Sequence, residues 1–259
     1  MNKTILPSTP YLIAHRGDTT KYPENTFCAI EAAVNCGARF VEIDIQFTLD
    51  GVAVVFHDES LLRMTGHDSL ITETTSDALK QYPILNENFP AIKNEHIAIP
   101  HLQDVIQYLK HINDVILFVE IKEESLEKFG INWIVDKLLK TIDPLKNRAV
   151  LISYNHSALS YSRQNNQQSL GWVIKEYTEL SQQIAMQLKP DYLFCNHQKI
   201  KSSALWPGDW KWALYEITDP ELAIELASTG IELIETMEIS NMFKHTLLAK
   251  QCYDHDKKL

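Results

Sequence analysis

The segment Arg39–Phe47 reads RFVEIDIQF, and the segment Val52–Phe56 after it reads VAVVF. Within the first segment Glu42 and Asp44 alternate with aliphatic residues. Period two places both carboxylates on one face of a strand and the aliphatic side chains on the other. Two carboxylates that face the inside of a protein are costly unless they are paired or bound to a metal. This strand is therefore predicted to carry a site as well as part of the core.

Further short apolar runs of this kind recur along the chain and alternate with amphipathic stretches. They are rich in Val, Ile, Leu and aromatic residues, which is typical of strands. Eight strands alternating with helices predict a parallel sheet, and eight is the number that closes a (β/α)8 TIM barrel. An open doubly wound sheet is the alternative, but no Gly-x-Gly-x-x-Gly loop of its dinucleotide-binding form follows the first strand. The predicted strands are Tyr11–His15, Arg39–Phe47, Val115–Ile121, Ala149–Ser153, Leu170–Ile174, Tyr192–Cys195, Lys211–Ile217 and Ile231–Thr236.

Val52–Phe56 does not fit this alternation, because only a few residues, among them Asp50 and Gly51, precede it. Parallel strands need a crossover of about a dozen residues, so this pair is predicted to be an antiparallel hairpin. A turn centred between Asp50 and Gly51 places His57 opposite Asp44. From about residue 47 to residue 99 no clear barrel helix follows. We therefore expect a single TIM-barrel domain over residues 1–259, with this stretch as a small insertion at the mouth.

Several helices have their own start and stop signals. We expect Asn25 to cap a helix that ends at Gly37, and Pro100 and Pro220 to open two later helices. These helices fall between predicted strands, as the barrel requires.

Composition limits the classes of function. The chain has 259 residues, and 24 basic against 34 acidic residues give a net charge of −10. An acidic chain is a poor candidate for broad binding of nucleic acid or anionic membranes. The four scattered cysteines form no Cys-x-x-Cys pair and are typical of free thiols in a reducing compartment. Because no apolar segment reaches signal-peptide or membrane-spanning length, we expect a cytoplasmic protein, either monomer or homodimer, without membrane insertion.

A third carboxylate is expected beside the first two. On the strand Val115–Ile121 the alternation places Glu120 and Lys122 on one face. Glu42, Asp44 and Glu120 can then converge from neighbouring strands at the barrel mouth. A site whose ligands are all oxygen atoms favours a hard divalent cation such as Mg²⁺ or Ca²⁺ over zinc.

Basic side chains are expected around the same point. The first strand ends in His15, Arg16 and Gly17, and an arginine can hold a phosphate through two hydrogen bonds. Lys122 adds a second cation, and His57 adds a second imidazole. Each motif alone has an ordinary structural explanation, such as a salt-bridged strand end. Two histidines, cations and a metal at consecutive strand ends suit phosphodiester cleavage, in which one group removes a proton and another protonates the leaving oxygen.

These motifs, in this order, resemble the glycerophosphodiester phosphodiesterase family. The match runs from residue 12 to residue 122, and the C-terminal half matches less well. The matching motifs are His15-Arg16-Gly17, Glu24-Asn25-Thr26, Glu42-Ile43-Asp44, Asp50-Gly51, His57-Asp58, Pro100-His101-Leu102 and Glu120-Ile121-Lys122.

The resemblance implies a barrel with a small insertion after the second strand and one divalent cation, with Mn²⁺ as an alternative to Mg²⁺ and Ca²⁺. The implied roles are Glu42, Asp44 and Glu120 as metal ligands, His15 and His57 as the acid and base, and Arg16, Lys122 and Trp212 as substrate-binding residues. Trp212 looks like the late tryptophan of the family, although Ala213-Leu214-Tyr215 replaces the usual Thr-Val-Asn.

The implied activity is hydrolysis of glycerophosphodiesters, such as glycerophosphocholine or glycerophosphoethanolamine, to glycerol 3-phosphate and an alcohol. This reaction belongs to glycerol and lipid metabolism. Two alternatives stay open from the sequence. One keeps the chemistry but takes a lipid substrate, as a lysophospholipase D or a sphingomyelinase-D-like enzyme does. The other is a catalytically silent phosphate-binding barrel.

Overall fold

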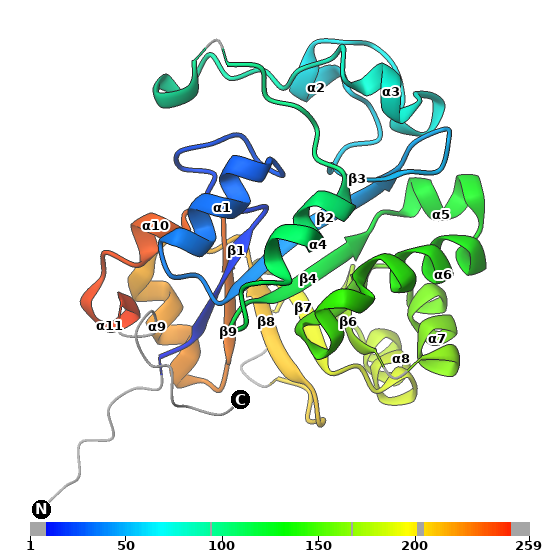
Figure 1. Cartoon of the computed structure of the whole chain (residues 1–259). Helices are drawn as coiled ribbons and strands as arrows, with labels where there is room; N and C mark the ends of the chain where they lie inside the picture. The colour runs from blue at the N-terminus through cyan, green and yellow to red at the C-terminus, as the bar shows by residue number, and fades with distance from the viewer. Residues whose placement is uncertain (1–8, 94, 167, 201–204, 250–259) are drawn as a thin grey trace, which may run out of the picture.

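Eight parallel strands close into a barrel in the computed structural model, which describes residues 9–249 apart from 94, 167 and 201–204 (Figure 1). The ring closes because β1 pairs with both β2 and β9. The (β/α)8 TIM barrel predicted from the sequence is confirmed. Its strands are β1 (Tyr11–His15), β2 (Phe40–Phe47), β4 (Ile116–Ile121), β5 (Ala149–Ser153), β6 (Ser169–Val173), β7 (Tyr192–Asn196), β8 (Lys211–Tyr215) and β9 (Leu233–Thr236).

Helices between the strands lie on the outside of the barrel (Figure 1). Among the described residues, no helix is both long enough and apolar enough to cross a membrane. The helices that follow barrel strands are α1 (Phe27–Asn35), α4 (Leu102–Leu109), α5 (Glu123–Phe129), α6 (Ile131–Ile142), η3 (Asp143–Arg148), α7 (His156–Asn165), α8 (Glu179–Leu188), η4 (His197–Lys199), α9 (Pro220–Ser228), α10 (Ile239–Met242) and α11 (Thr246–Ala249).

Alternation along the strands separates two apolar layers. Inside the barrel, Ile13, Phe40 and Phe118 belong to one buried cluster. Val41 and Ile43 belong to a larger cluster that includes the apolar faces of the surrounding helices. Because side chains alternate between the two faces of β2, the polar residues at its even-numbered positions face the inside of the barrel.

The hairpin after β2 is antiparallel, as predicted, but its register is not the predicted one. Strand β3 (Ala53–Val55) pairs with β2 so that Ile45 lies opposite Val55. The turn is therefore centred on Asp50, and Gly51 takes the left-handed backbone that closes a three-residue loop. The shift by one residue places Phe56, rather than His57, opposite Asp44, and the Phe56 N–H donates to the Asp44 carbonyl.

Two predicted helix starts have different outcomes. Helix α9 begins at Pro220, as predicted, with Asp219 as its cap. The cap assigned to Asn25 was wrong, because the hydroxyl of Thr26 accepts the N–H of Ala29 at 3.2 Å. Asn25 has a left-handed backbone (φ 56°), and its side chain is used elsewhere, as described below.

The chain between β2 and α4 forms a separate small layer, which we call the insertion segment (residues 48–101). Its short helices α2 and α3 lie beyond β3 in Figure 1. It has its own buried cluster, which includes Phe56, Leu61, Ile71 and Ile84. Its helical elements are α2 (Leu62–Thr65), η1 (Ile71–Glu73), α3 (Ser76–Leu79) and η2 (Pro90–Ile92).

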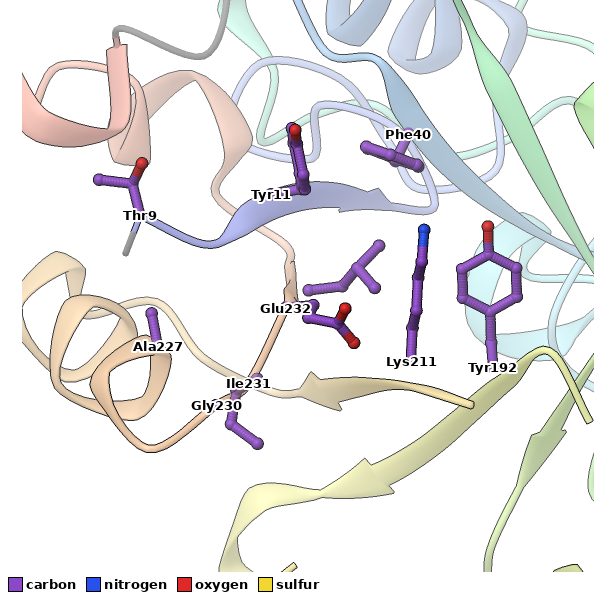
Figure 2. A pocket seen from close by; sticks show the side chains of 10 residues that line it. Thr9, Tyr11, Phe40, Tyr192, Lys211, Ala227, Gly230, Ile231 and Glu232 are labelled. Carbon is purple, nitrogen blue, oxygen red and sulfur yellow. The ribbon is translucent and has the colours of Figure 1, made fainter. Parts of the chain in front are cut away.

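A cavity of about 160 Å³ opens at the end of the barrel where the strands begin (Figure 2). Tyr11, Tyr192 and Lys211, the first residues of β1, β7 and β8, line it together with apolar side chains. In TIM barrels this end contributes to stability, whereas enzyme sites lie at the carboxyl ends of the strands. The described lining includes none of the residues predicted for catalysis.

Candidate active site

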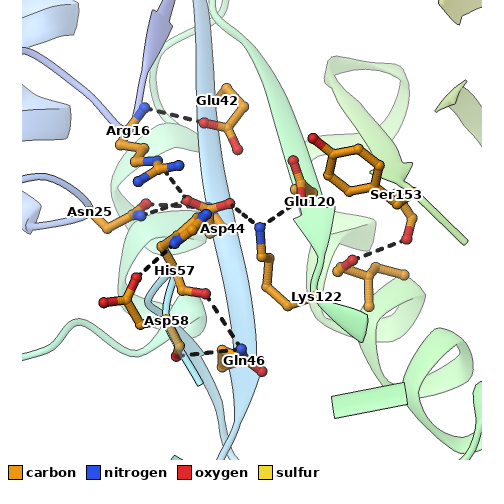
Figure 3. Close-up of polar contacts among 12 residues, drawn as sticks. Arg16, Asn25, Glu42, Asp44, Gln46, His57, Asp58, Glu120, Lys122 and Ser153 are labelled. Atoms are coloured by element: carbon orange, nitrogen blue, oxygen red, sulfur yellow. Dashed lines mark hydrogen bonds and ion pairs between the residues drawn. The ribbon is translucent and has the colours of Figure 1, made fainter. Parts of the chain in front are cut away.

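A second cavity, of about 260 Å³, lies at the carboxyl ends of the strands. The parallel register places His15 beside Glu42 and Asp44 beside Glu120. His57 reaches the same cavity from the insertion segment. The structure therefore brings together seven of the eight residues predicted for the site, which are His15, Arg16, Glu42, Asp44, His57, Glu120 and Lys122. Figure 3 shows all of these except His15.

Asp44 is the centre of the polar network in Figure 3. Its carboxylate lies 3.0 Å from Arg16 Nε and 3.2 Å from Lys122 Nζ, and it accepts a hydrogen bond of 2.8 Å from Asn25. Asn25 Oδ1 in turn accepts the backbone N–H of Asp44 at 3.2 Å. Burial disfavours the charged form, but the charges of Lys122 and Arg16 outweigh it, so the pKa of Asp44 lies below its usual value. Asp44 is a carboxylate at neutral pH.

Three carboxylates lie close enough to share a cation. Glu42, Asp44 and Glu120 offer oxygen atoms that are all within 4.8 Å of one another. Burial, together with the charge of Asp44, raises the pKa of Glu42. Glu42 Oε1 is buried and has no hydrogen-bond partner among the described residues. An orphaned oxygen among oxygen ligands fits a hard divalent cation.

The backbone after β1 explains the His-Arg-Gly motif. Arg16 has a left-handed backbone (φ 59°), and its N–H donates both to the Glu42 carbonyl and to the Glu42 carboxylate. A Cβ on Gly17 would lie 2.5 Å from the carbonyl carbon of Ala29, so only glycine fits between this turn and helix α1. The turn directs the Arg16 guanidinium to Asp44 and, at 2.8 Å, to Glu24.

The two histidines have different surroundings. Burial and the neighbouring charge of Arg16 lower the pKa of His15 to about 3, so this imidazole is neutral at physiological pH. Its Nε2 lies 3.8 Å from the Glu42 carboxylate. His57 Nδ1 lies 2.8 Å from an oxygen of Asp58, a contact that fixes the orientation of the ring.

Sequence reasoning did not identify Arg63, which lies in α2 of the insertion segment. Its Nε and NH2 donate to the two oxygens of Asp58 at 2.6 and 2.9 Å. The same guanidinium donates to Glu24 at 2.7 Å, and Glu24 also accepts from Arg16. Arg63 therefore connects the partner of His57 with the partner of Arg16. No short motif signals this role, because it depends on how the insertion segment folds back.

The structure does not bring Trp212 to this cavity. Trp212 belongs to the outer layer, where its ring packs at 5.8 Å from that of Trp206 and its N–H donates to the Trp206 carbonyl. Tyr215, on the opposite face of β8, lines the cavity instead, and its hydroxyl lies 3.0 Å from that of Tyr154. The period of two along β8 was the signal that could have separated Trp212 from Tyr215.

The described site also contains a carboxylate that was not predicted. Glu235 on β9 is 4% exposed and lines the cavity. Burial and the charge of Glu120 raise its pKa well above the usual value for glutamate. Alternation along β9 places it on the same inner face as Leu233.

The fold and this site define a TIM barrel that can hold an anionic ligand beside a cation. The model of the glycerophosphoryl diester phosphodiesterase family matches residues 15–231, and the chain belongs to this family. A glycerophosphodiester phosphodiesterase of Caldanaerobacter subterraneus is 33% identical over 153 residues, which are 57% of this chain and 59% of that protein. One of Bacillus altitudinis is 30% identical over 149 residues, 58% of this chain. The matched region spans about 60% of the length of these curated relatives.

Solved structures resemble nearly the whole chain. A phosphodiesterase of Oleispira antarctica, solved with the product sn-glycerol-3-phosphate, has a TM-score of 0.78 and 26% identity, covering 91% of this chain and 96% of that one. A glycerophosphodiester phosphodiesterase of Parabacteroides distasonis has a TM-score of 0.77 and 20% identity, covering 93% of this chain and 98% of that one. The second likeness shows the fold alone.

Proposed function

We propose that this protein is a divalent-cation-dependent phosphodiesterase that hydrolyses glycerophosphodiesters to glycerol 3-phosphate and an alcohol. The observation that carries the proposal is the convergence of two imidazoles, two cations and an acidic cluster in one cavity. Membership of the family supports it, and so does the Oleispira antarctica relative with its bound glycerol phosphate. Glycerophosphocholine and glycerophosphoethanolamine are the substrates we expect, which places the reaction in lipid and glycerol metabolism.

The chain's own residues account for substrate binding and proton transfer. Arg16 and Lys122 line the cavity and attract the phosphodiester, and their charges offset the charge that grows on phosphorus oxygens in the transition state. His15, neutral and buried, is suited to accept a proton. His57, held by Asp58, is suited to donate one to the departing alcohol. Mg²⁺, Ca²⁺ or Mn²⁺ bound by Glu42, Asp44 and Glu120 would supply Lewis-acid stabilisation of the phosphate.

A hydroxyl of the substrate is the proposed first nucleophile. In a glycerophosphodiester, the hydroxyl next to the phosphoester carbon can attack phosphorus within the same molecule, which gains from proximity. His15 takes the hydroxyl proton, a bond from the hydroxyl oxygen to phosphorus forms, and the bond to the alcohol breaks as His57 protonates it. Water then opens the cyclic phosphate with the histidines in exchanged roles. Direct attack by water is the alternative, and a deoxy analogue cleaved at the parental rate would establish it.

A lysolipid is the second candidate substrate, with choline leaving and the acylglycerol staying on phosphorus, because a further cavity of about 290 Å³ lies beside the site. Met64, Leu85 and Phe89 line this cavity together with Glu24 and Arg63. Leu85 is 45% exposed, as a surface that meets an acyl chain would be. A lysophospholipase D activity would use this surface.

The test is an assay of glycerophosphocholine, glycerophosphoethanolamine and lysophosphatidylcholine with Mg²⁺, Ca²⁺ or Mn²⁺, followed by chelator. We expect turnover of the water-soluble diesters that chelation abolishes. Faster turnover of the lysolipid would favour the second candidate. If none of these three compounds is hydrolysed with any of the cations, the protein is a catalytically silent phosphate-binding barrel.

The proposal includes two further expectations. The insertion segment completes the site of a single domain, because it supplies His57, Asp58 and Arg63. A cytoplasmic location is supported by the free thiols of Cys28 and Cys195, which suit a reducing compartment.

A further inference from the structure

Glu235 makes the acidic cluster larger than its motifs indicate. In the register of the barrel, Glu235 lies opposite Ile13 on one side of β1, while Glu42 lies opposite His15 on the other side. His15, Glu42 and Glu235 offer ligand atoms that are all within 4.8 Å of one another. Glu42 also belongs to the group with Asp44 and Glu120, so the two groups share one residue.

The charges of this centre do not balance. Glu42, Asp44, Glu120 and Glu235 are each at most 9% exposed. Among the described residues, two cations contact these carboxylates. Arg16 contacts Asp44, and Lys122 contacts both Asp44 and Glu120. When all four carboxylates are ionised, the four negative charges exceed the two positive charges by two. Buried charges persist when they are paired or bound to a metal, and one divalent cation matches this excess.

A second observation points to a ligand in the same place. Glu42 is 1% exposed, and its Oε1 has no hydrogen-bond partner among the described residues. The two groups of possible ligands therefore share Glu42, whose carboxylate includes a buried oxygen that lacks a partner among the described residues. A cation at this position would contact an oxygen that the fold itself leaves unsatisfied.

We propose that Glu235 is a fourth carboxylate ligand of the cation site and that it makes this site selective for Ca²⁺ over Mg²⁺. The inference rests on the cation site of the proposed function. Ca²⁺ takes six to eight oxygen ligands in flexible geometry, whereas Mg²⁺ keeps several waters and is usually held by one or two carboxylates. Glu235 adds an oxygen ligand within 4.8 Å of Glu42 to those that Asp44 and Glu120 offer, and a larger set of oxygen ligands suits the larger ion.

Calorimetric titration of the purified chain with Ca²⁺ and with Mg²⁺ tests this inference without any assay of turnover. In Glu235→Gln, which keeps the shape of the side chain and removes its charge, Ca²⁺ should bind at least about tenfold more weakly, because ligand charge sets the affinity of such sites. Mg²⁺ affinity should change much less. In chelator the variant should melt at the same temperature as the wild type or higher, because glutamine keeps the shape of this buried side chain.

Glu216→Gln is the matched control. Glu216 lines the same cavity and contacts Asn196, but it lies outside both groups of possible ligands. Its replacement should leave both affinities unchanged. If Glu235→Gln does not fold, Glu235→Asp retains the charge on a shorter arm and should still weaken Ca²⁺ more than Mg²⁺.

The possible failures are distinguishable. Wild-type Ca²⁺ affinity in the Glu235 variants, or an equal loss for Ca²⁺ and Mg²⁺, overturns the role of Glu235 and leaves the proposed function in place. A wild-type chain that binds no divalent cation overturns the cation site and this inference together. A melting temperature in chelator that falls steeply in Glu235→Gln would show a structural role instead.

Discussion

The two halves of the site are held in place by different forces. His15, Glu42, Asp44 and Glu120 lie on neighbouring barrel strands, so the backbone register fixes their spacing. His57 lies in the insertion segment, one residue outside the hairpin register, and is oriented by its contact with Asp58. Sheet geometry therefore sets the barrel half, whereas the insertion half depends on a few charged contacts.

The largest effect is expected at the centre of the barrel half. Asp44→Asn removes the charge that pairs with Arg16 and Lys122 and removes a proposed cation ligand. Activity should fall to background, and stability should fall by about 1–3 kcal/mol because Arg16 and Lys122 each lose one of their two carboxylate partners. Steady-state assays and denaturant unfolding measure the two effects. Turnover that survives in this variant after chelation would contradict the ligand assignment.

The next effect is expected from the insertion half. His57→Ala should lower kcat by about 10²–10⁴-fold with a much smaller change in KM, since proton transfer matters in the transition state. His15→Ala should behave in the same way if both histidines transfer protons. A histidine variant that changes only KM would have a binding role.

Arg63→Gln tests whether the insertion half depends on charged contacts. The loss of the contacts to Asp58 and Glu24 should lower kcat by about 10–100-fold, as outer-shell partners do in metal sites. Arg63→Lys should recover part of the loss, because a lysine can reach one carboxylate but not both in the same geometry. Arg163→Gln removes an ion pair with Asp191 on the outside of the barrel and is the control. If the Arg63 and Arg163 variants lower kcat equally, Arg63 has no specific role in the site.

A pH effect should appear in the barrel half. Because burial and the charge of Asp44 raise the pKa of Glu42, this carboxyl keeps its proton at a pH where a free glutamate has lost it. A cation must displace that proton, so Ca²⁺ affinity should rise with pH, by at most about tenfold per pH unit for each proton released. Calorimetry in buffers of different ionisation enthalpy counts the protons. Affinity that falls as pH rises would contradict this sign.

The smallest effect is expected at Trp212, which lies outside both halves. Trp212→Phe should leave activity and KM unchanged and should cost less stability than the about 3–5 kcal/mol of a Trp→Ala truncation, because Phe fills part of the indole volume but does not donate to the Trp206 carbonyl. Tyr215→Phe, on the cavity side of the same strand, is the informative comparison. A large change in KM in the Trp212 variant, without one in the Tyr215 variant, would show that Trp212 contributes to substrate binding.

The barrel half was predictable from the sequence for two reasons. Side chains alternate along a strand, and parallel strands bring their carboxyl ends to the same end of the barrel. The alternation of Glu42 and Asp44 with aliphatic residues showed which face of β2 points inward. Along β8 and β9 the same alternation places Trp212 in the outer layer and Glu235 inside the barrel, which was not predicted for either residue. An asparagine just before a helix predicts a cap. The contact that Asn25 makes instead, with Asp44, joins residues from different elements and has no local signal in the sequence.

The insertion half was only partly predictable. The hairpin was expected, but its register depended on whether Gly51 closes a two-residue or a three-residue loop, which the Asp-Gly pair alone does not decide. Arg63 was missed because its contacts with Asp58 and Glu24 arise from the path of a segment without regular periodicity.

A phosphorus NMR time course of glycerophosphocholine with the wild-type chain and Ca²⁺ tests the central claim most directly. It shows which phosphoester bond breaks and whether both halves of the site act on one substrate. We predict a transient cyclic glycerol phosphate followed by glycerol 3-phosphate, with free choline released, and neither species in Asp44→Asn or His57→Ala. Formation of phosphocholine, or an unchanged substrate signal with Ca²⁺, Mg²⁺ and Mn²⁺ alike, would contradict the proposed function.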